Sequence, residues 1–487
     1  MLIDWLAIAP EIALTVTALL VLLADLNLRG QAKQLVAGVA AVGTVVALVF
    51  TLILWGDERS TFGGTFVVNE YAVVFKVLFL GSLLAILGIS WRFFAEGRYF
   101  QGEYYFLLLT SFIGMIIMPS ARDLLLLFVA LETVSIPAFI MAGMRKRSLY
   151  SSEAAMKFFL IGVLSVALML FGMSIVYGFT GTTYLPDIAA SIAALGTVDP
   201  LLAAAIMLVI VGFGFKISAV PFHFWAPDTY SGSPLPVAAM LAVASKAAGF
   251  AGLLAIAFIA FEPVAELWAP VLGVIAIVTM TLGNLVALQQ RDLIRLLAYS
   301  SVAQAGYMLI PFGLARSGAA QVNDAAVQAV LFYLIAYAVM NIGAFGVAIA
   351  VHRRTGMRSI SDYAGLASKS PLMAMAMTTF LLSLGGAPPT VGLWAKFAIV
   401  QAALTDVTGF AILLMVFLVI NSVIAFFYYL KVVKTMWMDS APEGLPALQP
   451  GFNLSLVVFV LLVGTVLLGV LPGLVSDATS LTGLAAG

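Results

Sequence analysis

The sequence predicts an all-α polytopic membrane protein with about fourteen transmembrane helices, built around two inverted five-helix repeats that each contain a broken helix. Three observations predict this fold. Of the 487 residues, 63% are hydrophobic and only 9% are charged, whereas a soluble domain carries about 25% charged residues. Apolar runs of about 20 residues, the length that crosses the hydrocarbon core, recur along the chain. Two sequence landmarks also recur at one common spacing.

Composition excludes several classes of function. The 23 basic and 23 acidic residues balance, so no nucleic-acid or acidic partner is indicated. Cysteine is absent, which excludes disulfides and thiolate-bound iron–sulfur clusters. The sequence also lacks a dinucleotide-binding motif, a phosphate-binding loop and a haem or metal ligand set. We therefore expect no cofactor and no metal in this chain. The first apolar segment lacks a basic start and a cleavage site, so we expect it to be retained.

The apolar runs predict fourteen spans. Their approximate bounds are 5–25, 33–55, 69–90, 101–118, 122–142, 153–178, 201–228, 236–260, 268–289, 295–314, 325–351, 372–401, 407–436 and 452–472. The segment 184–196 is too short to cross a bilayer. We expect it to form a surface connection or a short interfacial helix.

The distribution of lysine and arginine predicts the orientation. One set of alternate loops holds fourteen of these residues: Arg29, Lys33, Arg92, Arg98, Arg145, Lys146, Arg147, Arg291, Arg295, Arg353, Arg354, Arg358, Lys369 and Lys434. The opposite loops hold only Arg59, Arg122 and Arg316. Because loops rich in Lys and Arg stay on the cytoplasmic side, both termini are predicted to lie outside, in the periplasm of a bacterium.

Two repeated landmarks indicate an internal duplication. The tripeptide RDL at 122–124 recurs at 291–293, and the dipeptide WA at 225–226 recurs at 394–395. Both offsets, 291 − 122 and 394 − 225, equal 169. A common offset predicts duplication of a five-helix unit, and because five is odd the second copy enters the membrane from the other side.

The predicted division of the chain follows from this duplication. It comprises an N-terminal three-helix segment (1–100), a first repeat (101–262, spans four to eight), a second repeat (263–437, spans nine to thirteen) and a C-terminal helix (438–487).

Three lysines lie inside predicted spans, beside helix breaks or small residues. Lys216 precedes a proline in the stretch GFGFKISAVPFHFWAPDTYSGSP, Lys246 lies in PVAAMLAVASKAAGFAGLL, and Lys396 follows the double proline of LGGAPPTVGLWAKF. A lysine at the bilayer centre costs roughly 2.5–3.5 kcal/mol, and broken helices mark the binding region of many transporters. We expect these amines to carry protons. The alternative for each is a lysine that reaches the headgroups from a helix end.

Glu132, in LLLLFVALETVSIPAF, is a carboxylate deep within a predicted span. It lies ten residues past Arg122, or roughly 15 Å along a helix. A carboxylate at that depth is either neutral or paired, and Lys216 is the natural partner by depth. The alternative is a protonated glutamic acid bonded for packing. At the repeat offset (132 + 169) stands Ser301.

For each of four other titratable residues the sequence allows two interpretations of its role. His223 is suited to relay protons between buried amines or to cap carbonyls at the first break. Lys157 is an electrostatic accessory of the first site or an interface anchor. Lys431 ends a polar path or reaches the headgroups, the latter being favoured. Lys76 lies outside both repeats and suggests only a helix–helix or intersubunit contact.

At these residues the sequence resembles the antiporter-like, proton-translocating membrane subunits of respiratory complex I, the NADH–quinone oxidoreductase of bacteria, and among them the N-type subunits. The resemblance rests on GFGFKISAVPFHFWAPDTYSGSP, LLAYSSVAQAGYML and GGAPPTVGLWAKF and covers nearly the whole chain. It implies a proton relay with two accessory positions. The implied relay residues are Glu132, Lys216, Lys246 and Lys396, with His223 and Lys157 as accessories.

The resemblance also implies where the rest of the machinery lies. NADH, FMN, iron–sulfur clusters and quinone are expected in partner subunits. The neighbours expected within the membrane arm are a separate matter: other complex I subunits, including small membrane subunits and another antiporter-like subunit, in a bacterial inner membrane. Two alternatives stay open: a subunit of an Mrp-type cation/proton antiporter, and a structural membrane subunit without transport.

Overall fold

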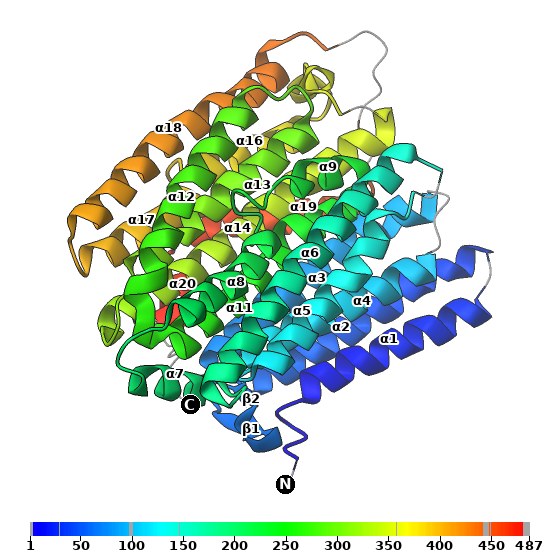
Figure 1. The fold of residues 1–487 in the computed structure, drawn as a ribbon. Coiled ribbons are helices and arrows are strands. Elements are labelled where there is room, and N and C mark those ends of the chain that lie inside the picture. The colour runs from blue at the N-terminus through cyan, green and yellow to red at the C-terminus, as the bar shows by residue number, and fades with distance from the viewer. Residues whose placement is uncertain are drawn as a thin grey trace.

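The computed structural model describes residues 3–28, 30–96, 101–145, 147–356, 358–441, 448 and 450–480. Within these residues the chain is a bundle of long helices lying side by side, with one short β hairpin at an end of the bundle (Figure 1). The predicted all-helical, multi-pass membrane architecture is confirmed. Arg29, Arg98 and Lys146, which contributed to the predicted orientation, lie outside the described residues.

Twelve helical stretches in the described part of the chain are long and apolar enough to cross a membrane. They are Ala9–Asn27, Ala32–Ile53, Glu70–Ala95, Gly102–Ser120, Leu124–Ala142, Leu149–Thr180, Leu235–Ala260, Glu262–Leu288, Leu293–Leu314, Ala320–Arg353, Gly409–Met438 and Phe452–Val470. Each overlaps one predicted span. The remaining predicted spans, 201–228 and 372–401, are each occupied by two shorter helices.

The N-terminal part of the chain contains the hairpin and the first seven helices. These are α1 (Ala9–Asn27), α2 (Leu35–Ile53), β1 (Arg59–Thr61), β2 (Phe66–Val68), α3 (Glu70–Glu96), α4 (Gln101–Ile117), α5 (Leu124–Ala142), α6 (Leu149–Thr180) and α7 (Leu185–Ala194). The two strands pair antiparallel, Arg59 with Val68 and Thr61 with Phe66. Helix α7 coincides with the segment predicted to be a short interfacial helix.

The remaining helices follow in two groups. The first is α8 (Pro200–Lys216), α9 (Trp225–Gly232), α10 (Leu235–Met240), α11 (Lys246–Ala255), α12 (Ala265–Leu288), α13 (Leu293–Leu309) and α14 (Ala320–Thr355). The second is α15 (Leu366–Lys369), α16 (Pro371–Gly385), α17 (Val391–Leu404), α18 (Gly409–Met438), α19 (Phe452–Val470) and α20 (Gly473–Ser480). A π-helical turn, Leu241–Ser245, joins α10 to α11.

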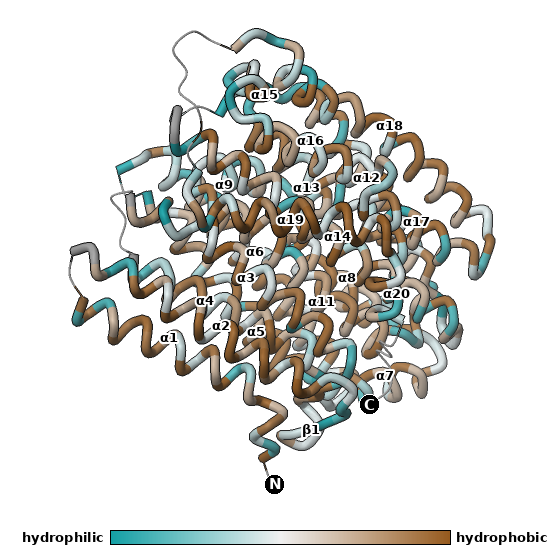
Figure 2. Tube along the Cα trace, turned by 180° about the vertical axis from the view of Figure 1, so that it is seen from behind, coloured by the Kyte–Doolittle hydropathy of each residue, from teal (hydrophilic) through white to brown (hydrophobic). Residues whose placement is uncertain are grey.

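Burial separates core helices from peripheral ones. In an 18-residue apolar window of the span that contains α10 and α11, 94% of the residues are buried, and in that of α14 89% are buried. In the corresponding windows of α18 and α19 only 28% of the residues are buried. The outer helices expose large apolar side chains, such as Val419 and Phe427 of α18. Figure 2 shows α1 and α18 hydrophobic along most of their length. Such surfaces suit lipid, and the polar residues that matter for transport are expected among the buried helices.

Two pairs of main-chain hydrogen bonds, here called clasps, connect the starts of α5 and α13 to segments distant in sequence. At α5, the amide of Leu124 donates to Thr183 (2.8 Å) and the amide of Leu185 donates to Arg122 (2.9 Å). At α13, the amide of Leu293 donates to Arg358 (2.9 Å) and that of Ile360 to Arg291 (2.8 Å). An aspartate caps each helix, Asp123 and Asp292, because its carboxylate accepts from free amides of the first turn.

The two clasps lie far apart. The first adjoins the hairpin, where Phe66 forms a bridge to Ala121. The second adjoins the segment that leads to α15. Figure 2 shows β1 and α15 at opposite ends of the bundle. The starts of α5 and α13 therefore face opposite ends.

Candidate functional site

The chain is interrupted between α8 and α9, directly after Lys216. Pro221 lies in this interruption, and proline cannot donate the hydrogen bond that a continuing helix needs. Ser218 adopts a left-handed conformation (φ 61°). Side chains satisfy backbone groups freed here: the indole of Trp225 donates to the carbonyl of Phe215 (3.2 Å), and the Thr279 hydroxyl accepts from the amide of Val220 (3.0 Å). Two of the backbone groups at the interruption are therefore hydrogen-bonded by side chains of the protein itself.

Lys216 is buried at this break, with 2% of its surface exposed. Its ammonium donates to the hydroxyl of Ser135 on α5 (2.9 Å). Ser135 lies three residues after Glu132, so both side chains share one face of α5. One carboxylate oxygen of Glu132 is buried without a hydrogen-bond partner. The structure thus brings Lys216 to the helix face that carries Glu132. Among the described residues, however, no ion pair of 4.0 Å or less joins the two.

Lys246 opens α11 and is 1% exposed. Its ammonium donates to both the carbonyl and the hydroxyl oxygen of Ser301 on α13, each at 2.6 Å. One turn further along α11, Gly249 packs against Lys216 and Ile217. A Cβ added there would lie 2.9 Å from side-chain carbons of both residues. The glycine therefore lets α11 approach the first break closely.

A second interruption separates α16 from α17. Helix α16 ends at Gly385, and Pro388 and Pro389 precede α17. Lys396, 8% exposed, folds back from α17 and donates to the carbonyl of Gly385 (2.6 Å). Its ammonium also lies 5.0 Å from the ring centroid of Tyr307 on α13, a favourable cation–π separation.

His223 lies between α8 and α9 and is 5% exposed. Its Nδ1 atom is buried without a hydrogen-bond partner, and its ring lies 4.5 Å from that of Phe224. The structure therefore leaves a titratable nitrogen free beside the break. No hydrogen bond between described residues joins His223 to Lys216 or Lys246.

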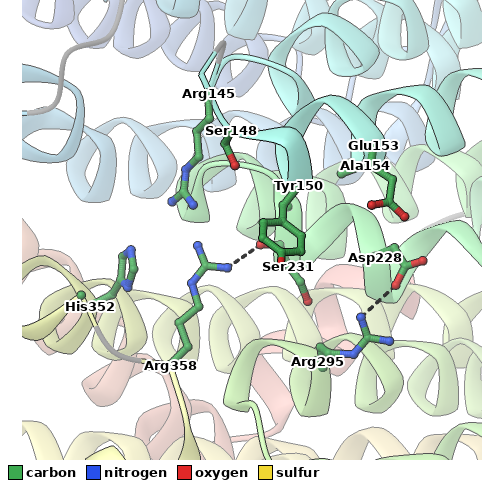
Figure 3. A pocket seen from close by; sticks show the side chains of 12 residues that line it. Arg145, Ser148, Tyr150, Glu153, Ala154, Asp228, Ser231, Arg295, His352 and Arg358 are labelled. Carbon is green, nitrogen blue, oxygen red and sulfur yellow. Dashed lines mark hydrogen bonds and ion pairs between the residues drawn. The ribbon is translucent and has the colours of Figure 1, made fainter.

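Lys157 lies apart from the buried lysines, in a surface cluster of charges. Its side chain is 43% exposed and forms ion pairs of 2.7 Å with Glu153 and Asp228. Asp228, on α9, also pairs with Arg295 of α13 at 2.8 Å. A cavity of about 590 Å³ opens here, and Figure 3 shows the Asp228–Arg295 pair on its wall. Lys157 thus contacts the broken segment at α9 rather than at Lys216.

Comparisons with known proteins identify the family of the chain. Residues 121–425 match the family model described as NADH:quinone oxidoreductase/Mrp antiporter, TM. NADH-quinone oxidoreductase subunit N 2 of Streptomyces griseus is 42% identical over 458 residues, which cover 91% of this chain and 84% of that protein. The chain belongs to the subunit N family of antiporter-like membrane subunits. Subunit N of Trichlorobacter lovleyi is 36% identical and covers 96% of this chain and 94% of its own.

Solved structures place the fold in the same family. A chain of respiratory complex I from Thermus thermophilus with bound Aureothin is 33% identical, with a TM-score of 0.79 over 97% of this chain and 100% of that chain. A chain of the Mrp complex from Dietzia sp. has a TM-score of 0.82 over 98% of this chain and 96% of that chain. Because it is only 21% identical, this second likeness concerns the fold alone.

This subunit N homologue also contains a buried ion pair outside the predicted relay. The ammonium of Lys76 on α3 lies 2.8 Å from a carboxylate oxygen of Glu11 on α1, with side chains 0% and 10% exposed. Lys76 also lies 4.9 Å from the ring centroid of Phe66. The pair accounts for Lys76 as a helix–helix contact. Lys431, in contrast, is exposed on α18.

Ligand-type residues do not gather into a metal site: no group of three or more His, Cys, Asp or Glu side chains occurs among the described residues. Sequence reasoning did miss three polar partners of the lysines, Ser135, Ser301 and the carbonyl of Gly385. The repeat offset pointed to one of them, since Ser301 follows Glu132 by 169 residues. The other two depend on how the broken helices fold back, which the sequence pattern does not specify.

Proposed function

We propose that this chain is a proton-translocating membrane-arm subunit of an NADH–quinone oxidoreductase. The observation that carries the proposal is that Lys216, Lys246 and Lys396 are all buried, each with its ammonium bonded to an oxygen inside the bundle. A buried ammonium is costly unless it is bonded, and residues of this kind in membrane spans mark ion and proton pathways.

The proposed architecture is the inverted-repeat plan expected from the sequence. Helices α8 with α9, and α16 with α17, act as two broken transmembrane helices, which together with the twelve long spans give fourteen. The matching clasps at α5 and α13, 169 residues apart and at opposite ends of the bundle, support the two repeats, 101–262 and 263–437. The segments 1–100 and 438–487 would then be the flanking parts.

The proposed relay begins at Glu132 and Lys216. At 4 Å and an effective dielectric constant of about 20, such a pair gains about 4 kcal/mol. Because no described ion pair of 4.0 Å or less joins them, this structure fits the parted arrangement. In it, Lys216 passes its proton through water and His223 toward Lys246. Each amine that accepts a proton becomes an ammonium as its donor becomes neutral, so charge is conserved along the relay.

Lys396 receives the proton from Lys246 and releases it toward the outside, and Lys157 acts as an accessory through Asp228. Redox chemistry in partner subunits, which would hold NADH, FMN, the iron–sulfur clusters and quinone, drives these steps. The expected neighbours are small membrane subunits and another antiporter-like subunit. The membrane would be the bacterial inner membrane, as the family implies, and the distribution of Lys and Arg supports an orientation with both termini on the periplasmic side.

The test is the Lys216→Ala variant of the whole complex, reconstituted in liposomes. Proton pumping should be lost while the complex still assembles, and full pumping would overturn the relay. A purely structural subunit predicts instead that Lys→Met changes at positions 216, 246 and 396 alter assembly but not the ratio of protons to electrons. An Mrp-type antiporter subunit predicts that redox subunits do not copurify with this chain.

A further inference from the structure

One face of α13 is polar and fully buried between the Lys246 and Lys396 sites. Ser300, Gln304 and Tyr307 follow at spacings of four and three residues, so they lie on one stripe of the helix. None of the three is exposed. A buried polar stripe is retained only where its groups are hydrogen-bonded, and each of these side chains has a partner on another helix.

The stripe meets a lysine site at each end. Ser300 precedes Ser301, whose oxygens hold the ammonium of Lys246. Further along the stripe, the amide of Gln304 donates to the carbonyl of Leu384 (3.1 Å), and the next carbonyl, that of Gly385, holds Lys396. Gln304 therefore links α13, whose Ser301 binds Lys246, to the end of α16, whose Gly385 carbonyl binds Lys396.

Gln304 joins two tyrosine hydroxyls as well. Its amide oxygen accepts from Tyr333 of α14 (2.5 Å), and its amide nitrogen donates to Tyr429 of α18 (3.4 Å). Tyr429 in turn shares a hydrogen bond of 2.5 Å with Ser300. The side-chain amide both donates and accepts, so Gln304 ties together α13, α14, α16 and α18 at one point.

We propose that Gln304 is a positioning residue for proton transfer from Lys246 to Lys396. The proposal rests on the relay proposed above. The amide does not carry the proton. Gln304 holds the hydroxyls of Tyr333 and Tyr429 and the Leu384–Gly385 carbonyls in place, and the proton passes along hydroxyls and water. The Lys246 ammonium loses one proton and the neutral Lys396 amine gains one, so the transfer is balanced.

The experiment compares Gln304→Leu with Lys396→Met and a matched control in the whole complex in liposomes. Leucine is similar in size but makes no hydrogen bonds. The control is Gln290→Leu, since among the described residues the Gln290 side-chain amide bonds within its own turn, to the carbonyl of Val286. We expect the ratio of protons pumped to electrons transferred to fall in Gln304→Leu to the value found for Lys396→Met. In Gln290→Leu the ratio should equal that of the wild type.

A second variant separates positioning from packing. In Gln304→Glu the side chain can donate to Leu384 only while it is protonated. Its surroundings include Tyr333, Tyr429, Tyr307 and, beyond the Gly385 carbonyl, Lys396. Pumping by this variant should therefore fall as the pH rises, with a profile steeper than that of the wild type. A residue that only fills space would leave the two profiles parallel.

The outcomes distinguish this inference from the relay itself. Full pumping by Gln304→Leu would refute the role of Gln304. If Gln304→Leu does not assemble, parallel pH profiles of Gln304→Glu and the wild type would refute it instead. If Lys246→Met and Lys396→Met also pump fully, the relay fails as well. If the two lysine variants lose pumping while Gln304→Leu pumps fully, the relay is supported and only the positioning role of Gln304 is refuted.

Discussion

Lys246 donates two hydrogen bonds of 2.6 Å to Ser301, and Ser301 stands 169 residues after Glu132. At the offset of the proposed repeat, α5 thus carries a carboxylate where α13 carries a hydroxyl. Lys216, the counterpart amine near α5, bonds to Ser135, and Ser135 corresponds at this offset to Gln304 (135 + 169). If the proposed repeat relates α5 to α13, corresponding positions of the two helices bind different lysines through different side chains.

Ser301→Ala should slow proton transfer through Lys246. It removes one of two acceptors for the ammonium, and a hydrogen bond to a charged group contributes about 1.5–3 kcal/mol. If about 1.4 kcal/mol of that enters the barrier, pumping falls roughly tenfold. Ser301→Thr keeps the hydroxyl and is the control. Pumping rates of the reconstituted complex measure the effect, and equal rates for the alanine and threonine variants would refute the role of the hydroxyl.

Lys76→Met should destabilise the chain without touching the relay. It leaves the buried Glu11 carboxylate without its partner, and breaking a buried pair costs about 3–5 kcal/mol. The double variant Glu11→Leu/Lys76→Met removes both charges and should recover most of this loss. The thermal midpoint of the purified complex is the measurement. A double variant no more stable than Lys76→Met would show that packing, not the ion pair, dominates there.

Gly392→Ala should disrupt the second helix break. A Cβ at this position would lie 1.7 Å from the carbonyl oxygen of Ser383, so α17 must move away from α16 and carry Lys396 with it. Overpacking of this kind costs about 1–3 kcal/mol. Gly409→Ala is the control, because nothing lies within 4 Å of a Cβ there. Limited proteolysis and pumping should both change in the first variant only.

Much of the fold could be predicted from the sequence, because the length of an apolar run limits what it can do in a bilayer. The prolines likewise located both interruptions, since a proline ends hydrogen bonding along a helix. The β1–β2 hairpin was not predicted, because its short strands carry no long alternating pattern. Residues of the hairpin and of the loop before α5 are held together by contacts distant in sequence, which periodicity does not reveal.

The site was predicted in part. Burial of three lysines followed from their position within apolar spans. Their partners did not, because a lysine side chain reaches several neighbours and helix rotation decides among them. Glu11 was overlooked because it lies only six residues after the start of the predicted span 5–25, near a helix end, where a carboxylate ordinarily meets water. Lys157 was placed near a helix start, and its partner Asp228 belongs to a segment whose direction after the break no local pattern determines.

The absence of a side chain at position 249 has a mechanical result. The stem of Lys216 rests directly on the backbone of α11, three residues from Lys246, with no room for one methyl group between them. A movement of the Lys216 side chain toward α11, as the proposed relay would involve, would therefore push the helix that carries Lys246. In the proposed relay, the two lysines would then be coupled by steric contact as well as by charge, and the steric coupling would persist even where water screens the electric field.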